Sequence, residues 1–502
     1  MYKIGNNCKN CKICTKNCPA KAIEEQDGRQ VITDRCVECS VCTRCCPFQA
    51  IEQVEEKRVT IQCKSCPVGC QIPENQMGAC KRYTNESGKI VRNRSLVQKN
   101  YKVELPKEYI RQPLITAVGA GTNYPCSKPA PYIVSECIEG VDVVTVVTEA
   151  PLSYSGILIK IDTNTYLGEE GDKVYRNNVA VGMVNIEEYG SKMIAVGGAN
   201  SLTGKNGFTV AQTIVDLANG EAVELSVSKK NTVVVQTGKA PIINGNVEQK
   251  MRIGCGSATV GLFAGIMKEA VDECIVLDHH VIGLASEHLA GEAVGMNYSG
   301  VVPNARKSTR GRYFGEHGQG IGGTSFMNPR EAIKEIDKKT ARIGMQILVV
   351  NTTGEVYALF EITDEWDVKE IPMTVNAQKV VQTIYDNCEE SKVSVMYSGG
   401  TGGSARGGVC NYPLALSKAV HSGKAVLTVG GAPTYVMPGG GINFLVDTNS
   451  VVDKAFTWVP TPATVAPIEY TMTKEDYKEI GGHMSQIVYM NQWNGMKANG
   501  NS

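Results

Sequence analysis

The sequence predicts a chain in two parts: a small cysteine-rich unit at the N-terminal end, followed by a large body of mixed α/β (α+β) fold. Two observations lead to this prediction. Thirteen of the 19 cysteines lie within the first 80 residues, and the other six are scattered through the rest of the chain. Beyond residue 135, Val- and Ile-rich segments typical of strands alternate with runs whose apolar residues recur at helical spacing.

The composition limits the partners that the chain can have. Its 502 residues correspond to about three domains of roughly 150 residues each. Lys plus Arg equals Asp plus Glu at 51 each, so no net charge favours nucleic acid or an anionic membrane. No apolar run approaches the ~18 residues of a membrane span, and the first residues lack the apolar core of a signal peptide. We therefore expect a cytoplasmic protein whose cysteines are reduced or bound to metal.

An eleven-residue pattern occurs twice near the start of the chain. The stretch "CTKNCPAKAIE" begins at Cys14, and "CTRCCPFQAIE" begins at Cys42. With the cysteines that precede it, each copy follows the C-x2-C-x2-C-x3-C-P spacing of bacterial ferredoxins, in which the fourth cysteine binds the cluster of the other half. The spacing therefore predicts a ferredoxin-like domain with two [4Fe-4S] clusters. The predicted ligands are Cys8, Cys11, Cys14 and Cys46 for the first cluster, and Cys36, Cys39, Cys42 and Cys18 for the second.

A zinc module is the alternative interpretation of this repeat, but zinc sites do not normally use such a doubled run. Cys45 aligns with Asn17 of the first copy, so it is surplus to the pattern and we expect it to bind no metal.

A third set of cysteines follows in "CKSCPVGCQIPENQMGAC". Its prolines and glycines allow the tight turns that bring backbone N–H groups towards cluster sulfurs. We predict a third iron–sulfur cluster, with a structural zinc site as the alternative. Its ligands would be Cys63, Cys66, Cys70 and Cys80.

These features divide the chain into four segments. We expect a ferredoxin-like domain at 1–57, a third cysteine module at 58–100, a proline-rich linker or extension at 101–135, and a glycine-rich α/β body at 136–502, with room for two subdomains. The predicted strands of the body are 141–150, 230–238, 273–280, 346–362, 393–400 and 425–433, and the clearest predicted helices are 257–271 and 375–390.

Four glycine-rich stretches occur in the body, and none has the frame of a dinucleotide-binding fingerprint or a P-loop. Tight turns are the simplest explanation of each. Glycine also lets backbone N–H groups approach a phosphate, and "YSGGTGGSARGG" adds a fixed cation to its glycines. This stretch is our first choice for a cofactor-binding loop, through Gly399, Gly400, Gly402, Gly403 and Arg406.

The body is predicted to hold a flavin, expected as FAD. Iron–sulfur clusters transfer single electrons, whereas reduction of an organic bond needs two, and a flavin collects two electrons one at a time. The alternative is that the clusters only relay electrons between protein partners.

The whole layout resembles the 6-hydroxynicotinate reductase family, the ferredoxin-dependent iron–sulfur flavoenzymes of anaerobic nicotinate fermentation. The likeness runs the full length of the chain, with motif-level agreement in residues 8–80 and general agreement in "LDHHVIGL" and "STRGRYFGEHGQGIGGTSF". The resemblance implies reduction of 6-hydroxynicotinate to 1,4,5,6-tetrahydro-6-oxonicotinate, with reduced ferredoxin as the electron donor. The partners expected are this donor and a small heteroaromatic carboxylate, without nucleic acid or a membrane, in a homo-oligomer.

Such a reaction needs a proton donor, a group that stabilises an enolate oxygen, and a cation for the substrate carboxylate. His279 and His280 follow an apolar strand, and Glu316 and His317 lie in a glycine-rich loop, so these four are the catalytic candidates. Packed or solvent-facing histidines are the alternative. Glu287 and His288 could converge on the same place. The substrate-binding candidates are Arg306, Arg310 and Arg312, with a solvated basic surface as the alternative.

Two other functions fit the sequence. The chain could be an electron-transfer subunit of a larger redox complex, with the body as a docking scaffold and no flavin. It could also be a regulatory or maturation protein whose clusters sense redox state.

Overall fold

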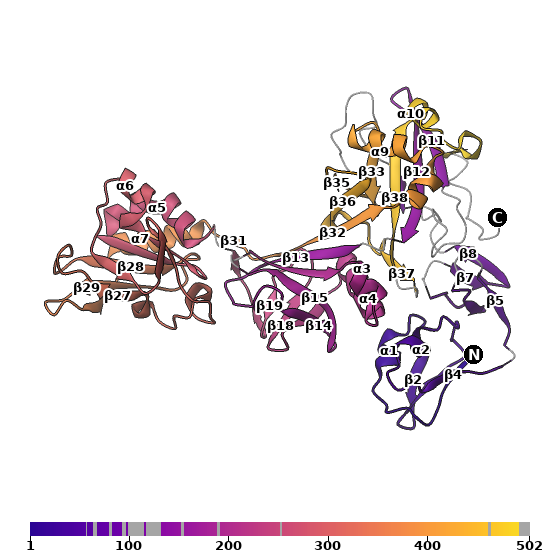
Figure 1. Cartoon of the computed structure of the whole chain (residues 1–502), viewed down its shortest axis with the longest axis horizontal. Helices are drawn as coiled ribbons and strands as arrows, with labels where there is room; N and C mark the ends of the chain where they lie inside the picture. Colours follow the sequence, from indigo (N-terminus) through magenta and orange to yellow (C-terminus); the bar gives the residue numbers. More distant parts are fainter. Residues whose placement is uncertain are drawn as a thin grey trace.

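The structure, a computed structural model, describes residues 1–56, 58–63, 68–79, 83–92, 97–98, 115–116, 132–151, 155–187, 191–251, 254–459 and 463–490. The fold is mixed α/β with many strands and fewer helices, as predicted (Figure 1). Most of the predicted linker 101–135 lies outside the described residues, as do Cys66 and Cys80 of the third cysteine set.

The N-terminal unit repeats itself in backbone conformation as well as in sequence. Helix α1 (Ile13–Asn17) and helix α2 (Val41–Cys45) occupy equivalent places in the two copies. Strand β1 (Tyr2–Ile4) pairs with β4 (Ile51–Gln53), and β2 (Ile23–Gln26) pairs with β3 (Arg29–Ile32). Each pair therefore joins the strand before one helix to the strand after the other helix. Left-handed backbone also recurs at matched positions: Asn10 and Glu38, Lys12 and Ser40, Lys21 and Gln49.

The segment after this unit folds onto it. It consists of two antiparallel pairs, β5 (Thr60–Gln62) with β6 (Gln71–Pro73) and β7 (Tyr83–Glu86) with β8 (Lys89–Arg92). The amide of Gln71 donates to the carbonyl of Val37 over 3.0 Å. Buried Cys63, Cys70 and Ile72 form one apolar cluster with Val37, so the third cysteine set lies against the loop that carries the second repeat.

An eleven-stranded antiparallel sheet forms the middle of the molecule. Its spatial order is β20 (Asn246–Val247), β19 (Ile242–Ile243), β18 (Asn231–Val235), β17 (Val223–Val227), β14 (Lys173–Arg176), β15 (Val179–Ile186), β16 (Ser191–Gly197), β13 (Gly156–Asp162), β32 (Val393–Thr401), β36 (Ile442–Asp447) and β35 (Tyr435–Val436).

A second sheet, of seven strands, packs beside the first. Its order is β34 (Ala432–Pro433), β33 (Val426–Val429), β38 (Ala463–Thr473), β12 (Val141–Pro151), β11 (Tyr132–Ile138) and β39 (Val488–Tyr489), and β37 (Thr457–Val459) also pairs with β38.

These two sheets share one hydrophobic core with helix α4 (Gly207–Ala218), which is apolar almost all round and therefore almost wholly buried. Val41 of α2 and Cys39 pack into the same core. The cysteine-rich unit is therefore fastened to the body through its second repeat.

Residues 254–388 form a separate lobe inserted into the body (Figure 1). The chain enters the lobe after β21 (Lys250–Met251) and leaves it through β31 (Glu389–Glu390), and these two short strands pair antiparallel. The lobe sheet has the order β25 (Arg306–Thr309), β26 (Arg312–Phe314), β23 (Val281–Leu284), β22 (Glu273–Leu277), β28 (Gln346–Asn351), β29 (Tyr357–Ile362) and β30 (Val368–Ile371). Outside it, β24 (Val301–Pro303) pairs with β27 (Ile333–Ile336).

Both faces of the lobe sheet are covered. Ile275, Leu277 and Ile347 face one apolar cluster with Phe326 and Ile333, whereas their neighbours along the strands face the opposite cluster. The opposite cluster contains helices α5 (Gly256–Ala270) and α7 (Val375–Asp386). Burial on both faces explains the unbroken apolar runs 274–277 of β22 and 347–350 of β28, and these two strands are parallel.

The predicted strands and helices are present at nearly the predicted positions, with 346–362 divided into β28 and β29 and 425–433 into β33 and β34. Most strand pairs are antiparallel. The alternation of strand-like and helix-like segments in the sequence did not indicate this orientation. The remaining α-helices are α3 (Ala199–Thr203), α6 (Leu289–Ala293), α8 (Gly403–Val409), α9 (Pro413–His421) and α10 (Lys474–Glu479). None of the helices in the described ranges is both long and apolar enough to cross a lipid bilayer.

A pair of leucines in the lobe tests the assigned core. Leu348 of β28 is fully buried and Leu262 of α5 is 60% exposed. Leu348→Ala should lower the free energy of unfolding of the lobe by about 2–5 kcal/mol, because it leaves a cavity, whereas Leu262→Ala should change it by less than about 0.5 kcal/mol. Urea denaturation of the two purified variants measures both values. Equal stabilities would contradict the assigned core.

Candidate functional site

The cysteines of the repeat line two small cavities. Cys8, Cys11, Cys14 and Cys46 line the first, together with apolar side chains such as Ile13 and Ile51. Cys18, Cys36, Cys39 and Cys42 line the second, together with Ile23 and Val41. Each cavity thus gathers one of the two predicted ligand sets, three cysteines from one copy and the fourth from the other.

The chemistry of these cavities fits an iron–sulfur cube. Backbone amides of Ala22 and Ala50 donate to the sulfurs of Cys18 and Cys46 over 3.2 and 3.4 Å, at matched places in the two copies. Burial, together with the neighbouring sulfurs of Cys18 and Cys36, raises the pKa of Cys39 to about 12. Four thiols gathered in an apolar cavity disfavour their own thiolate forms, so a bound iron cation is needed to stabilise the charge.

Cys45 is not among the cysteines that line the two cavities. Its thiol donates to the carbonyl of Cys42 over 3.5 Å, and burial raises its pKa to about 12. Of the third set, Cys63 and Cys70 are buried close together, and the amide of Cys63 donates to the carbonyl of Cys70 over 2.8 Å.

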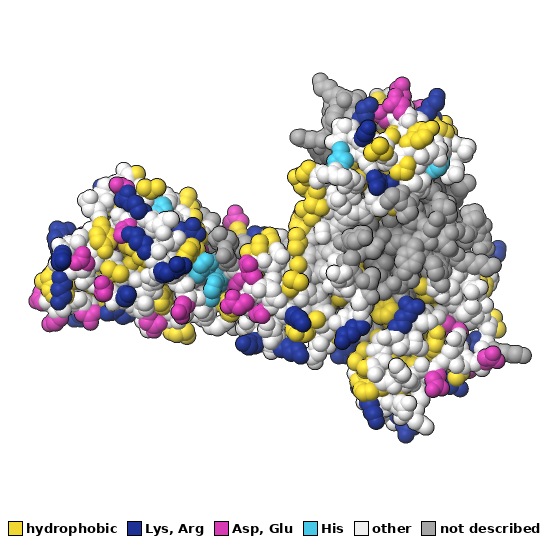
Figure 2. All heavy atoms as spheres, viewed as in Figure 1, with side chains coloured by type: hydrophobic (Ala, Val, Ile, Leu, Met, Phe, Trp, Pro, Cys, Tyr) yellow, Lys and Arg dark blue, Asp and Glu magenta, His cyan; other side chains and the backbone are white. Residues whose placement is uncertain are grey.

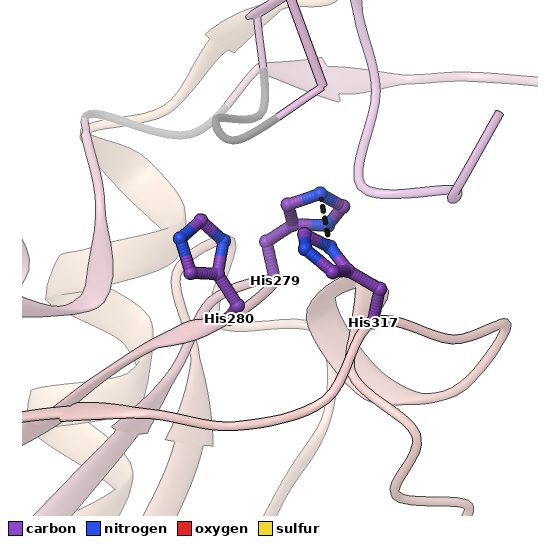
Figure 3. Close-up of side chains that lie close together, drawn as sticks. All are labelled: His279, His280 and His317. Carbon is purple, nitrogen blue, oxygen red and sulfur yellow. Dashed lines mark hydrogen bonds between the residues drawn. The ribbon is translucent and has the colours of Figure 1, made fainter. Parts of the chain in front are cut away.

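A second group of chemically active side chains lies where the inserted lobe meets the eleven-stranded sheet. His279, His280 and His317 each offer a ring nitrogen, and these nitrogens all lie within 4.8 Å of one another (Figure 3). His279 is fully buried, whereas the other two are half-buried. Histidine side chains reach the surface beside the narrow connection between lobe and body (Figure 2).

Local backbone geometry brings the three histidines together. The turn between β22 and β23 places His279 at φ 53°, in left-handed backbone, so that it and His280 project from the carboxyl end of β22. The amide of Gly315 donates to the carbonyl of His280 over 2.8 Å, which fixes the strand leading to His317. Gly323, at φ 81°, packs against the ring of His279, and a Cβ there would collide with Nδ1 of that ring. One glycine-rich stretch is thus explained by packing.

The body contributes a buried ion pair to the same place. Lys192 Nζ lies 3.0 Å from Glu187 Oε1 and 3.2 Å from His279 Nε2. His317 Nδ1 lies 3.0 Å from His279 Nε2 in turn. Burial raises the pKa of Glu187 to about 7, although Lys192 opposes this shift. The carboxyl group can therefore exchange a proton near neutral pH.

Neither Lys192 nor Glu187 was among the predicted site residues. A signal for Lys192 existed, because in the strand "SKMIAVG" it shares one face with Ile194 and Val196, both buried. A lysine on the inward face of a strand requires a partner.

The three arginine candidates have different surroundings. The guanidinium of Arg312 lies 5.2 Å and that of Arg306 6.0 Å from the ring of Phe314, and this ring lies 5.3 Å from His280. Nε of Arg312 is buried and has no hydrogen-bond partner among the described residues. Arg310 pairs instead with exposed Glu292 over 3.0 Å.

The other acidic and histidine candidates have different surroundings. Glu316 precedes His317, but its side chain is exposed. Glu287 accepts hydrogen bonds from Lys307 and Tyr313 over 2.8 and 2.9 Å, and His288 Nε2 contacts Ser257 over 3.0 Å. The contacts of Glu287 and His288 are thus with residues other than the three histidines, and their convergence with His279 stays a prediction.

The predicted cofactor loop lies elsewhere in the body. Gly399 and Gly400 are in β32, where a Cβ would meet Phe444 and Asn443 of the adjacent strand. Gly402 precedes α8 and has open space around it, and Gly403 begins that helix. Arg406 donates to Ser417 of α9. Binding of a flavin phosphate here stays a prediction.

Comparison with known proteins identifies the family. No protein-family model matches the chain, and no solved structure matches it. A curated protein from Eubacterium barkeri named 6-hydroxynicotinate reductase is 62% identical over 498 residues, which cover 98% of this chain and 100% of the relative. With that identity over almost its entire length, the chain belongs to the 6-hydroxynicotinate reductase family.

Proposed function

We propose that this chain reduces 6-hydroxynicotinate to 1,4,5,6-tetrahydro-6-oxonicotinate, using two electrons from reduced ferredoxin and two protons. The observation that carries the proposal is the full-length relative at 62% identity, whose name states this substrate. The two cavities lined by four cysteines each support the electron-transfer part of the reaction.

The substrate determines what the protein has to supply. In its lactam form the ring has a C=C bond conjugated to a carbonyl group, so hydride adds at C4 and a proton at C5. Negative charge develops on the carbonyl oxygen meanwhile, and the ring carboxylate has to be held in place. The junction of lobe and body has groups for each task. His280 and His317 are our candidates to stabilise the oxygen, directly or through a bound ion, or to deliver the proton, and Arg312 and Arg306 are our candidates to bind the carboxylate.

Electrons are proposed to reach the body through the two cysteine cavities in order. The first cavity includes the exposed Cys11, which suits it to accept electrons from an external ferredoxin. Cys39 of the second cavity packs against the core of the body and also against the cluster containing Cys63 and Cys70. A third iron–sulfur cluster, held by these two residues with Cys66 and Cys80, would therefore be next to the second.

The cysteine-rich unit and the histidine group lie on opposite sides of the eleven-stranded sheet (Figure 1). Single electrons must therefore be carried across the body, or across a contact with a second chain, before the ring is reduced. A flavin, expected as FAD, would convert single electrons into a hydride. The conversion of single electrons into a hydride is the reason for predicting a flavin, and the possible path through a second chain is the reason for predicting a homo-oligomer.

An anaerobic assay tests the function. We expect purified chain with reduced ferredoxin to consume 6-hydroxynicotinate and to form the tetrahydro product, and the visible spectrum to contain flavin bands beside the iron–sulfur absorption. Iron–sulfur absorption without flavin bands and without turnover would favour the alternative, an electron-transfer subunit of a larger complex.

Two neighbouring cysteines test the ligand assignment. Cys42→Ser should lose the cluster of the second cavity and abolish ferredoxin-driven reduction, because Cys42 lines that cavity. Cys45→Ser should keep the iron and acid-labile sulfide of the unchanged protein, because its thiol contacts a backbone carbonyl. Iron and sulfide assays on anaerobically purified variants measure this. Equal losses in the two variants would show that the assignment is wrong.

Two arginines of the same hairpin test the carboxylate site. Arg312→Ala should weaken binding of 6-hydroxynicotinate by about ten- to a hundred-fold, because a charge-assisted hydrogen bond contributes ~1.5–3 kcal/mol. It should also reduce the preference for 6-hydroxynicotinate over the uncharged 2-pyridone. Arg310→Ala is the matched control, since Arg310 pairs with exposed Glu292. Steady-state kinetics with both ring compounds measure these effects, and unchanged affinity in Arg312→Ala would exclude this residue as the carboxylate ligand.

A further inference from the structure

We propose that His279, His280 and His317 form a binding site for a divalent first-row transition metal ion. The site is separate from the cysteine cavities, and metal binding there goes beyond the reduction proposed above. The inference depends on the arrangement of these three side chains and of the carboxylate beside them.

The spacing of the ring nitrogens fits a metal ion. A tetrahedral zinc site with Zn–N bonds of about 2.0–2.1 Å places its ligand nitrogens about 3.3 Å apart. His317 Nδ1 and His279 Nε2 already face each other over 3.0 Å. The widest separation in the group is within 4.8 Å, so closure needs a shift of about 1.5 Å. His280 and His317 are half-buried, so part of each ring borders solvent, and a rotation of this size displaces fewer packed neighbours than a rotation of the buried His279.

The ligand set indicates the class of metal. Imidazole nitrogen binds zinc, iron, copper and nickel, whereas calcium and magnesium prefer oxygen ligands. Three protein ligands with a further position open is the pattern of catalytic rather than structural zinc sites. His280 and His317 are half-buried whereas His279 is buried, so the open position would lie on the side of the group that borders solvent.

A buried carboxylate next to the histidines supports the assignment independently. Glu187 is 3% exposed, and its Oε2 has no hydrogen-bond partner among the described residues. Its other oxygen, Oε1, lies 3.5 Å from His279 Nε2. This is the same nitrogen that faces His317 and would bind the ion, so the carboxylate would act as a counter-charge to the ion and would not orient the ring through its other nitrogen.

The cation Lys192 contacts this group, and its charge is matched by Glu187 over 3.0 Å. The lysine and the glutamate together are neutral, so this pair does not oppose the charge of an incoming metal ion. Lys192 also holds Glu187 close to the histidines, which keeps this counter-charge in position.

The open position would take an oxygen ligand such as water, a carbonyl group or an enolate. If the proposed function is right, the lactam oxygen of the substrate belongs to this class, and a metal ion would stabilise the charge that develops on it. Only this last step rests on the proposed function.

Metal analysis of the anaerobically purified whole chain tests the site. An iron–sulfur cube contains equal amounts of iron and sulfide, so metal bound by the histidines is measured as iron in excess of acid-labile sulfide, or as another metal. We expect about one such metal per chain. After removal with a weak chelator, Zn²⁺ alone should restore about one tightly bound ion, measured by competition with a chromophoric chelator.

Single substitutions locate the ion. His280→Ala and His317→Ala should each lower the excess metal and the Zn²⁺ uptake at least tenfold, with sulfide content and thermal unfolding unchanged. These half-buried residues are preferred over His279, whose buried ring also packs at the junction. His421→Ala is the control, because its exposed ring, on helix α9 of the body, contacts the carbonyl of Gly441 and its loss should leave the metal in place.

Two results would overturn the proposal. One is a whole chain that has no metal in excess of sulfide and takes up no Zn²⁺, which would mean that the histidines are only hydrogen-bonded to one another. The other is excess metal that persists in both His280→Ala and His317→Ala. Metal content is read without turnover, so these results are distinct from a failure of the proposed reaction.

Discussion

The buried contact between Lys192 and His279 is the interaction on which the arrangement of the site depends. Lys192 is fully buried in the eleven-stranded sheet, and His279 is fully buried at the edge of the inserted lobe. A charge in such a position is tolerated only with a partner, and removing one partner of a buried ion pair costs about 3–5 kcal/mol. Glu187 is that partner, at 3.0 Å. The contact of Lys192 with His279 joins the sheet to the lobe, so it forms only when the lobe is seated against the sheet, and seating the lobe also fixes the ring of His279 and, through it, His317.

The sequence was a good guide to the elements of the fold and a poor guide to their partners. Runs of Val and Ile marked β12, β28 and β32 because a strand buried on one or both faces needs them. The hydrophobic pattern of a strand does not indicate its partner when the two paired strands are far apart in the sequence. Strand β13 pairs with β32 across the whole inserted lobe, and β12 pairs with β38. The division of the body into a central part and an insertion could therefore not be predicted beyond the expectation of two subdomains.

The spacing of the cysteines was enough to predict how the fold groups them. The eight cysteines of the repeat line two cavities in the predicted sets, because three cysteines lie within one turn-rich loop and the fourth follows from the duplication. The histidines were each suspected from their own position, after a strand or in a glycine-rich loop. Their convergence depends on the pairing of β23 with β26, which only the fold provides. Among the arginines, Arg310 and Arg312 are two residues apart in sequence, yet only Arg312 lies beside Phe314 and His280.

The short paired strands β21 and β31 have a consequence for the history and the engineering of the chain. Because they lie side by side, the lobe begins and ends at neighbouring points, so the path of the surrounding body is the same whether or not the lobe is present. A gene segment of this kind can be gained, exchanged or lost in one step without disturbing the strands on either side. The three histidines belong to this inserted segment, whereas Lys192 and Glu187, which contact them, belong to the surrounding body. A transplanted lobe would therefore keep its fold but acquire new chemistry from each body into which it is placed.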